Sequence, residues 1–195
     1  MTKLPDPILT ICGLEELGLH GASGVTHVVS ILDPGQPEPE AFATYDPHQR
    51  AVLRFHDVID PAPGMVLPTE DDVRTVLVFG KEVSAWSKEV RASHVLVHCT
   101  AGISRSSAVV AILLAQREPD RDEDSIFAEV VRLRSKAWPN SCLIAFADEL
   151  LSRGGRLNRA LARHYRRQLV TFPFVMQYMR DNGRAREVDM ATGAG

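Results

Sequence analysis

The stretch at residues 95–106 (VLVHCTAGISRS) constrains the fold of this chain more than any other feature. It begins with a short run of β-branched apolar residues, which is typical of a strand buried in a mainly parallel sheet. It continues into SRSSAVVAILLAQ, which predicts a helix over residues 104–116. Gly102 lies between them and permits a backbone conformation that a Cβ would obstruct. The chain is therefore predicted to contain a strand, a tight loop and a helix in immediate succession.

A loop of this kind can bind an anion. Successive backbone N–H groups point inward around the anion, and the N-terminus of the following helix adds partial positive charge. Arg105 returns to the mouth of the loop, where its planar guanidinium can hold two phosphate oxygens. The same donors stabilise a thiolate, so we expect Cys99 to be charged near neutral pH. This stretch predicts attack of a sulfur nucleophile on a phosphomonoester.

The stretch resembles the HCxxGxxRS/T signature, the CX5R motif, of the cysteine-dependent protein tyrosine phosphatases, most closely their dual-specificity, bacterial-type branch. The resemblance implies that Cys99 forms a phosphocysteine intermediate and that the Ser106 hydroxyl helps the thiolate leave. It places His98 behind the nucleophile and requires neither a metal nor a cofactor. The phosphoryl group would be bound by the Arg105 side chain and the backbone amides of Thr100, Ala101, Gly102, Ile103, Ser104 and Arg105.

The family also needs an acid that protonates the leaving group, which in the dual-specificity branch is an aspartate on a loop after the preceding strand. Asp57 follows the strand predicted at residues 51–55 and matches this position best. Asp60, on the same loop, is the alternative. Asp57 could also be an ordinary turn residue at the end of a strand.

The rest of the chain alternates strand and helix patterns before it becomes helical. Thr69 and Asp72 form a capping-box pattern that predicts the start of a further helix. The pattern indicates an α/β fold with a central, mainly parallel sheet of four to five strands, flanking helices and a helical C-terminal half. We expect a single phosphatase-like domain over residues 1–182, with residues 183–195 as a flexible tail. Strands are predicted at residues 8–12, 26–32, 51–55 and 93–98, and helices at residues 104–116, 124–134, 141–152 and 156–169.

Composition excludes several classes of protein. The 195 residues are 45% hydrophobic and 24% charged, which is ordinary for a globular protein. The three cysteines are too few and too scattered for a disulfide framework. No pair of them forms CxxC, which excludes a zinc ribbon. The longest apolar run, residues 108–115, is too short to span a membrane. Residues 1–10 lack the apolar core of a secretion signal. We therefore expect a cytoplasmic protein without an integral membrane segment.

Charge is unevenly distributed along the chain. Residues 153–186 contain nine arginines and one acid, so this segment carries a net charge of +8. Because the whole chain has a net charge of −3, the remaining residues carry −11. Such an acidic body is not typical of a nucleic-acid binder. Within the basic segment, residues 156–182, apolar residues recur every four positions with arginines on the other side. Two interpretations remain open. The helix packs on the domain with its arginines in solvent, or it is an arm that forms a homodimer or contacts an acidic surface.

These observations favour a phosphatase acting on a phosphorylated protein or a small phosphomonoester. Inositol phospholipids would favour lysines in the loop, and residues 100–104 are uncharged. The choice between phosphotyrosine and phosphoserine or phosphothreonine stays open. One alternative is a module that binds phosphate without turnover. Another is a redox sensor in which Cys12 or Cys142 forms a disulfide with Cys99.

Overall fold

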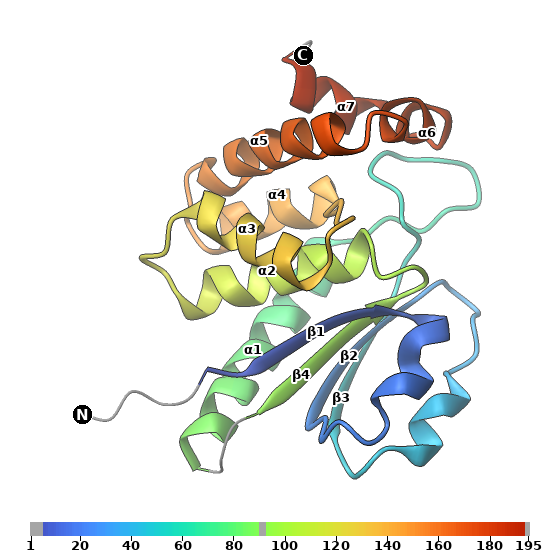
Figure 1. Ribbon diagram of the computed structural model, residues 1–195, viewed down its shortest axis with the longest axis vertical. Coiled ribbons are helices and arrows are strands. Elements are labelled where there is room, and N and C mark those ends of the chain that lie inside the picture. The colour runs from blue at the N-terminus through green and yellow to red at the C-terminus, as the bar shows by residue number, and fades with distance from the viewer. Residues whose placement is uncertain (1–5, 90–92, 194–195) are drawn as a thin grey trace.

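The computed structural model of the chain describes residues 6–89 and 93–193, and its centre is a sheet of four parallel strands (Figure 1). The order across the sheet is β1-β4-β2-β3. Strand β4 is buried along its whole length between two neighbours, as its continuous apolar sequence predicts. The strands are β1 (Ile8–Gly13), β2 (His27–Leu32), β3 (Gln49–Arg54) and β4 (His94–Cys99).

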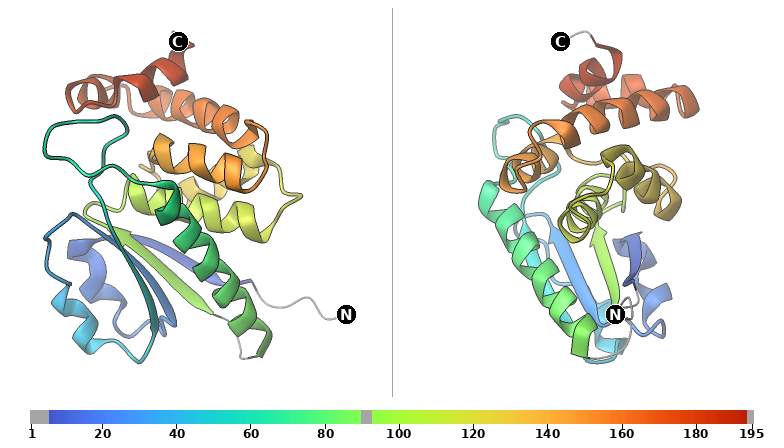
Figure 2. Two further views of the ribbon diagram at one scale, coloured as in Figure 1. Left: turned by 180° about the vertical axis from the view of Figure 1, so that it is seen from behind. Right: turned by 90° about the vertical axis from the view of Figure 1, so that its left-hand side faces the viewer.

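Helices cover both faces of this sheet (Figures 1 and 2). The α-helices α1 and α2 pack on one face, and two short 3-10 helices, η1 and η2, cover the other. The remaining helices stack beyond α2 as a helical layer. The α-helices are α1 (Glu70–Glu89), α2 (Arg105–Arg117), α3 (Glu123–Leu133), α4 (Ser141–Leu150), α5 (Arg156–Thr171), α6 (Val175–Asp181) and α7 (Ala185–Thr192), and the 3-10 helices are η1 (Leu14–His20) and η2 (Glu40–Thr44).

Side chains that alternate along the strands enter two separate cores. In β4, Val95 and Val97 face the larger core under α1 and α2, whereas Leu96 faces a smaller core beneath η1. The larger core also takes nearly all of α2, in which every residue from Arg105 to Ala115 is buried. The α/β fold with a parallel sheet and a helical C-terminal half is confirmed, with four strands. No helix in the described part of the chain is long and apolar enough to cross a membrane.

Helix α5 packs on its own chain, against α3, α4 and α7. Leu157, Leu161 and Tyr165 on its apolar side are fully buried. On the opposite side, Arg163 pairs with Asp124 of α3. This arrangement fits the first of the two interpretations of the basic segment, because the apolar side is already covered.

The prediction of a flexible tail over residues 183–195 is wrong for residues 185–192, which form α7. Glu187 and Val188 of this helix are completely buried. The sequence signal is weak because the helix is short and its main anchor is a charged residue, which is normally found at the surface. Residues 194 and 195 of the predicted tail lie outside the described residues.

Candidate active site

The loop from Cys99 to Arg105 joins the end of β4 to the start of α2, as predicted. Cys99 is only 2% exposed, and its Sγ lies 3.3 Å from the Oγ of Ser106 in the first turn of α2. Gly102 has φ +69°, and a Cβ there would lie 2.6 Å from the backbone carbon of Cys12. Only glycine therefore fits this point of the loop.

Neighbouring segments hold the loop from two sides. At the start of η1, directly after β1, the backbone N–H of Leu14 donates a hydrogen bond to the carbonyl oxygen of Thr100 (3.1 Å). From the segment before α4, the N–H of Trp138 donates to the carbonyl oxygen of Ile103 (2.9 Å). These bonds satisfy two carbonyl oxygens of the loop and fix the conformation of the loop before a ligand binds. A preorganised loop can stabilise the charge of a bound anion without first having to rearrange.

Arg105 is buried beside this loop and has an unused donor. Its Nη1 donates to Asp33 Oδ1 (2.5 Å) and to the carbonyl oxygen of Phe55 (2.6 Å), and its Nη2 donates to Thr100 Oγ1 (3.0 Å). Its buried Nε has no hydrogen-bond partner among the described residues. An unpaired buried donor is costly, and an oxyanion in the loop would satisfy it. Asp33 was not predicted as a site residue, because the sequence marks it only as part of a turn after a strand.

His98 is fully buried on the side of β4 opposite Cys99. Its Nε2 lies 2.7 Å from Ser30 Oγ, and Arg50 Nε donates to the same hydroxyl at 2.9 Å. Burial, together with the charge of Arg50, lowers the pKa of His98 to about 4. The imidazole is therefore neutral at pH 7, where it supports the strand from which the loop departs.

Asp57 lines the pocket, and only one of its two carboxylate oxygens accepts hydrogen bonds from described residues. Its Oδ1 accepts hydrogen bonds from Ser104 Oγ (2.7 Å), Asn140 Nδ2 (3.0 Å) and Arg184 Nη1 (3.1 Å). No described residue donates a hydrogen bond to Oδ2. Asp60, the alternative acid, pairs with Arg186 at 3.1 Å and does not line the described pocket.

Arg184 is a site residue that the sequence analysis missed. It is only 4% exposed, and its Nε and Nη2 each donate to Glu187 of α7 at 2.8 Å. Glu187 also accepts from Trp138 Nε1 (2.6 Å) and from the backbone N–H of Ser141 (2.8 Å). The C-terminal helix is thus connected through buried hydrogen bonds to Asp57 and to the loop. No local sequence pattern marks this contact, because its partners are separated by 127 positions along the chain.

The loop and Asp57 open into a pocket of about 640 Å³. The pocket brings together Cys99, Asp57, Arg105 and four of the five residues at 100–104, all predicted to be site residues. Gly102 and Ser106 do not line it. Across residues 6–89 and 93–193, no group of three or more His, Cys, Asp or Glu side chains could hold a metal ion. The pocket is also lined by residues of the C-terminal helices and of the segments between them, namely Gln168, Phe172, Phe174, Val175, Tyr178, Met179, Asn182 and Arg184.

Solved structures share this fold at low sequence identity. Human DUSP28 matches with a TM-score of 0.54 and 19% identity, over 78% of this chain and 99% of that chain. DUSP15 matches with a TM-score of 0.51 and 20% identity, over 83% of this chain and 94% of that chain. A putative mouse dual specificity phosphatase, solved with zinc tungstate, matches with a TM-score of 0.53 and 18% identity, over 82% of this chain and 96% of that chain. These likenesses show the fold.

Residues 63–140 match the family model of the protein-tyrosine phosphatases. This match includes β4, the loop and α2, and therefore the whole signature. The part of the chain that carries the signature is therefore similar to the protein-tyrosine phosphatases. Asp57 and the C-terminal helices lie outside the matched residues, and none of the curated proteins compared with the chain matches it.

The other two cysteines of the chain are free and differ from Cys99 in their surroundings. Burial raises the pKa of Cys12 to about 12, and burial also raises the pKa of Cys142. Both thiols are therefore protonated at neutral pH. A protonated thiol is a poor partner in disulfide exchange, which argues against the redox-sensor interpretation.

Proposed function

We propose that this phosphatase hydrolyses phosphomonoesters on proteins through a phosphocysteine on Cys99. One observation carries the proposal: a buried guanidinium with an unpartnered Nε lies in the same glycine-containing loop as the cysteine. Such a loop suits a tetrahedral oxyanion, because its amides and guanidinium are donors only. Phosphotyrosine is the expected substrate, with phosphoserine and phosphothreonine as further candidates.

The reaction has two steps. The Cys99 thiolate attacks phosphorus, the ester P–O bond breaks, and Asp57 gives its proton to the departing oxygen. Water then attacks the phosphocysteine, Asp57 takes a proton from that water, and the S–P bond breaks. Ser106 Oγ, 3.3 Å from Sγ, stabilises the departing thiolate by donating a hydrogen bond. Arg105 neutralises the charge that develops on the phosphoryl oxygens, and Asp33 holds its guanidinium in place.

The nucleophile is tested with a phosphotyrosine peptide in the presence of excess chelator. Wild-type protein should release phosphate without metal, and vanadate should inhibit it. The Cys99→Ser variant should lose at least about a thousandfold in kcat, because an alcohol is a much weaker nucleophile than a thiolate. Cys142→Ser is the matched control and should retain activity. Turnover by Cys99→Ser, or loss of activity on chelation, would contradict the proposal.

A phosphate-binding module without turnover is not the favoured alternative, because Asp57 lines the pocket with Oδ2 available. Tight binding of the phosphopeptide by wild-type protein, without any product over hours, would support the module instead.

The homodimer through the C-terminal helix and the cytoplasmic location stay predictions from the sequence. The apolar side of α5 is used within the chain, so a dimer would have to form on exposed residues such as Val170, which is 80% exposed. Light scattering over a dilution series should show a mass that falls toward the monomer if such a dimer exists.

A further inference from the structure

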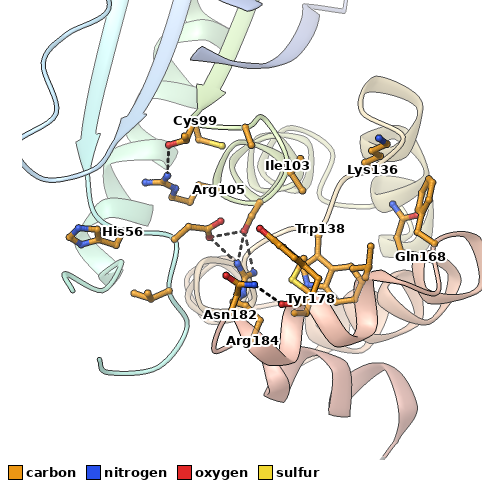
Figure 3. Close-up of a pocket in the computed structure, with 18 of the residues that line it drawn as sticks. His56, Cys99, Ile103, Arg105, Lys136, Trp138, Gln168, Tyr178, Asn182 and Arg184 are labelled. Atoms are coloured by element: carbon orange, nitrogen blue, oxygen red, sulfur yellow. Dashed lines mark hydrogen bonds and ion pairs between the residues drawn. The ribbon is translucent and has the colours of Figure 1, made fainter. Parts of the chain in front are cut away.

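One wall of the active-site pocket is apolar and comes from segments outside the signature. Phe174 is 70% exposed, Tyr178 is 60% exposed, and Met65 on the loop after β3 is 49% exposed. All three line the pocket that also contains Cys99. We call Met65, Phe174 and Tyr178 the apolar wall. Figure 3 shows Tyr178 and Trp138 on one side of the pocket, with Cys99 and Arg105 at the other end.

The apolar wall rests on fixed backbone although its side chains are exposed. Between Phe174 and Tyr178 the chain is helical, and Met179 anchors α6 with 7% exposure. The loop that carries Met65 is fastened at two points. Val66 N donates to His56 Nδ1 (2.8 Å), and Arg186 Nη2 donates to the carbonyl oxygen of Ile59 (2.6 Å). The wall is therefore preformed, which lowers the entropic cost of binding a ligand against it.

Size and charge indicate what this wall can bind. The volume of about 640 Å³ leaves room for much more than a phosphoryl group. Of the cations that line the pocket, Arg105 is paired with Asp33, and Arg184 is paired with Glu187 and Asp57. Lys136 is the one lining cation without an ion pair among the described residues. The pocket therefore offers little positive charge that could bind a second phosphate. An apolar group suits the space in the pocket that the phosphoryl group does not fill.

We propose that the apolar wall is a subsite for a large apolar side chain that flanks the phosphorylated residue of a protein substrate. The inference rests on the proposed phosphatase function and names the substrate class of the same site. The phosphoryl group occupies the loop, and the neighbouring side chain covers Phe174 and Tyr178. Burial of these exposed aromatic side chains favours substrates with a large apolar residue at that position. This preference requires no charged contact.

The charges around the wall favour a peptide over a lipid surface. Binding to anionic membranes uses clusters of several Lys and Arg side chains around an apolar patch. On α6, Arg180 is paired with Asp189, and on the Met65 loop the carboxylate of Asp60 is 55% exposed and paired with Arg186. These pairs leave little net positive charge to attract anionic headgroups.

The test compares phosphotyrosine peptides that are identical except for Phe or Ser next to the phosphotyrosine, placed on either side of it. Wild-type protein should prefer one Phe peptide to its Ser counterpart by roughly tenfold in kcat/KM. The double variant Phe174→Ser, Tyr178→Ser should treat the two peptides equally. Both side chains are exposed, so the variant should fold normally. Val170→Ser, an equally exposed position outside the pocket lining, is the matched control and should keep the preference.

Different failures are distinguishable. Turnover of a small aryl phosphate by wild-type protein tests the catalytic site separately from the apolar wall. Absence of any turnover would contradict the phosphatase function itself. Turnover without a Phe preference in wild-type protein would overturn the subsite alone. Binding of wild-type protein to vesicles containing anionic phospholipid, lost in the double variant and accompanied by no peptide preference, would assign the wall to lipid and overturn the proposal.

Discussion

At the scale of single residues, the two oxygens of Asp57 have different surroundings. Three donors hold Oδ1, so the orientation of the carboxyl group is set by Ser104, Asn140 and Arg184. Oδ2 is then the oxygen on which a transferable proton can reside. A general acid must be held within reach of the leaving group without its proton being taken up by a protein acceptor.

Replacing Asp57 by Asn should lower kcat on a phosphotyrosine peptide by roughly 10²–10⁴-fold, the usual contribution of a general acid. The loss should be smaller with an aryl phosphate whose leaving group needs no protonation. Asp60→Asn is the matched control on the same loop and should have little effect. Steady-state rates on both substrates decide the assignment, and a loss confined to the Asp60 variant would show that Asp60 is the acid.

Arg184 should affect catalysis through Asp57, as a positioning residue. Arg184→Lys keeps the positive charge beside Glu187 but loses the planar fork that reaches Asp57 and Ser104 together. We expect kcat on the phosphotyrosine peptide to fall about tenfold, with KM little changed. Combining it with Asp57→Asn should add no further loss, because the two changes remove the same function. An additive loss in this double-mutant cycle would contradict the coupling.

At the scale of elements, α7 is fastened to the body of the fold through one buried carboxylate. Glu187 accepts bonds from Arg184, Trp138 and Ser141, which belong to segments on both sides of α5. A helix of this length contributes little stability of its own, so tertiary contacts hold it in place.

Glu187→Ala should lower the free energy of unfolding by about 3–5 kcal/mol, because it leaves the buried Arg184 charge without its main partner. Asp189→Ala on the same helix removes only a partly exposed pair with Arg180 and should cost less than about 1 kcal/mol. Urea denaturation of both variants measures the difference. Equal small losses would mean that α7 is not anchored by this carboxylate.

At the scale of the whole molecule, two buried neutral histidines couple folding to pH. His98 is 0% exposed and His164 is 1% exposed, and burial lowers the pKa of each from 6.5 to about 4. Between these values the unfolded chain binds more protons than the folded one. Stability is therefore lost as the pH falls from 6.5 toward 4, and these groups have no effect well above pH 6.5.

Each histidine should remove about 1 kcal/mol from the free energy of unfolding between pH 6.5 and 5.5, because its unfolded form is already half protonated at pH 6.5. Urea titrations at the two pH values measure this loss. His164→Gln should reduce this pH dependence by the contribution of one histidine, although its stability at pH 7 also changes. An unchanged pH dependence in that variant would show that His164 is not buried in its neutral form.

The reaction chemistry could be predicted from the sequence because it is local. Cys99, Gly102 and Arg105 lie within seven positions, and a strand followed by a glycine-containing turn and a helix brings their groups around one point. The alternating apolar residues of β4 and the capping box of α1 are equally local signals. Asp57 could be proposed from its position after β3, but its contacts could not.

Sequence patterns alone therefore predict the α/β class, most of the strands and helices along the chain, and the tight loop from Cys99 to Arg105. The packing of distant elements adds groups that no sequence pattern marks, namely Asp33 beside Arg105, Arg184 beside Asp57, Glu187 beside Trp138, and the apolar wall. These groups contact residues 49 to 127 positions away along the chain, and the apolar wall combines exposed side chains of α6, of the residue before it and of the loop after β3. Neither the long-range contacts nor the apolar wall produces a periodic sequence pattern. Both depend on how whole elements pack and not on the residues next to them in the chain.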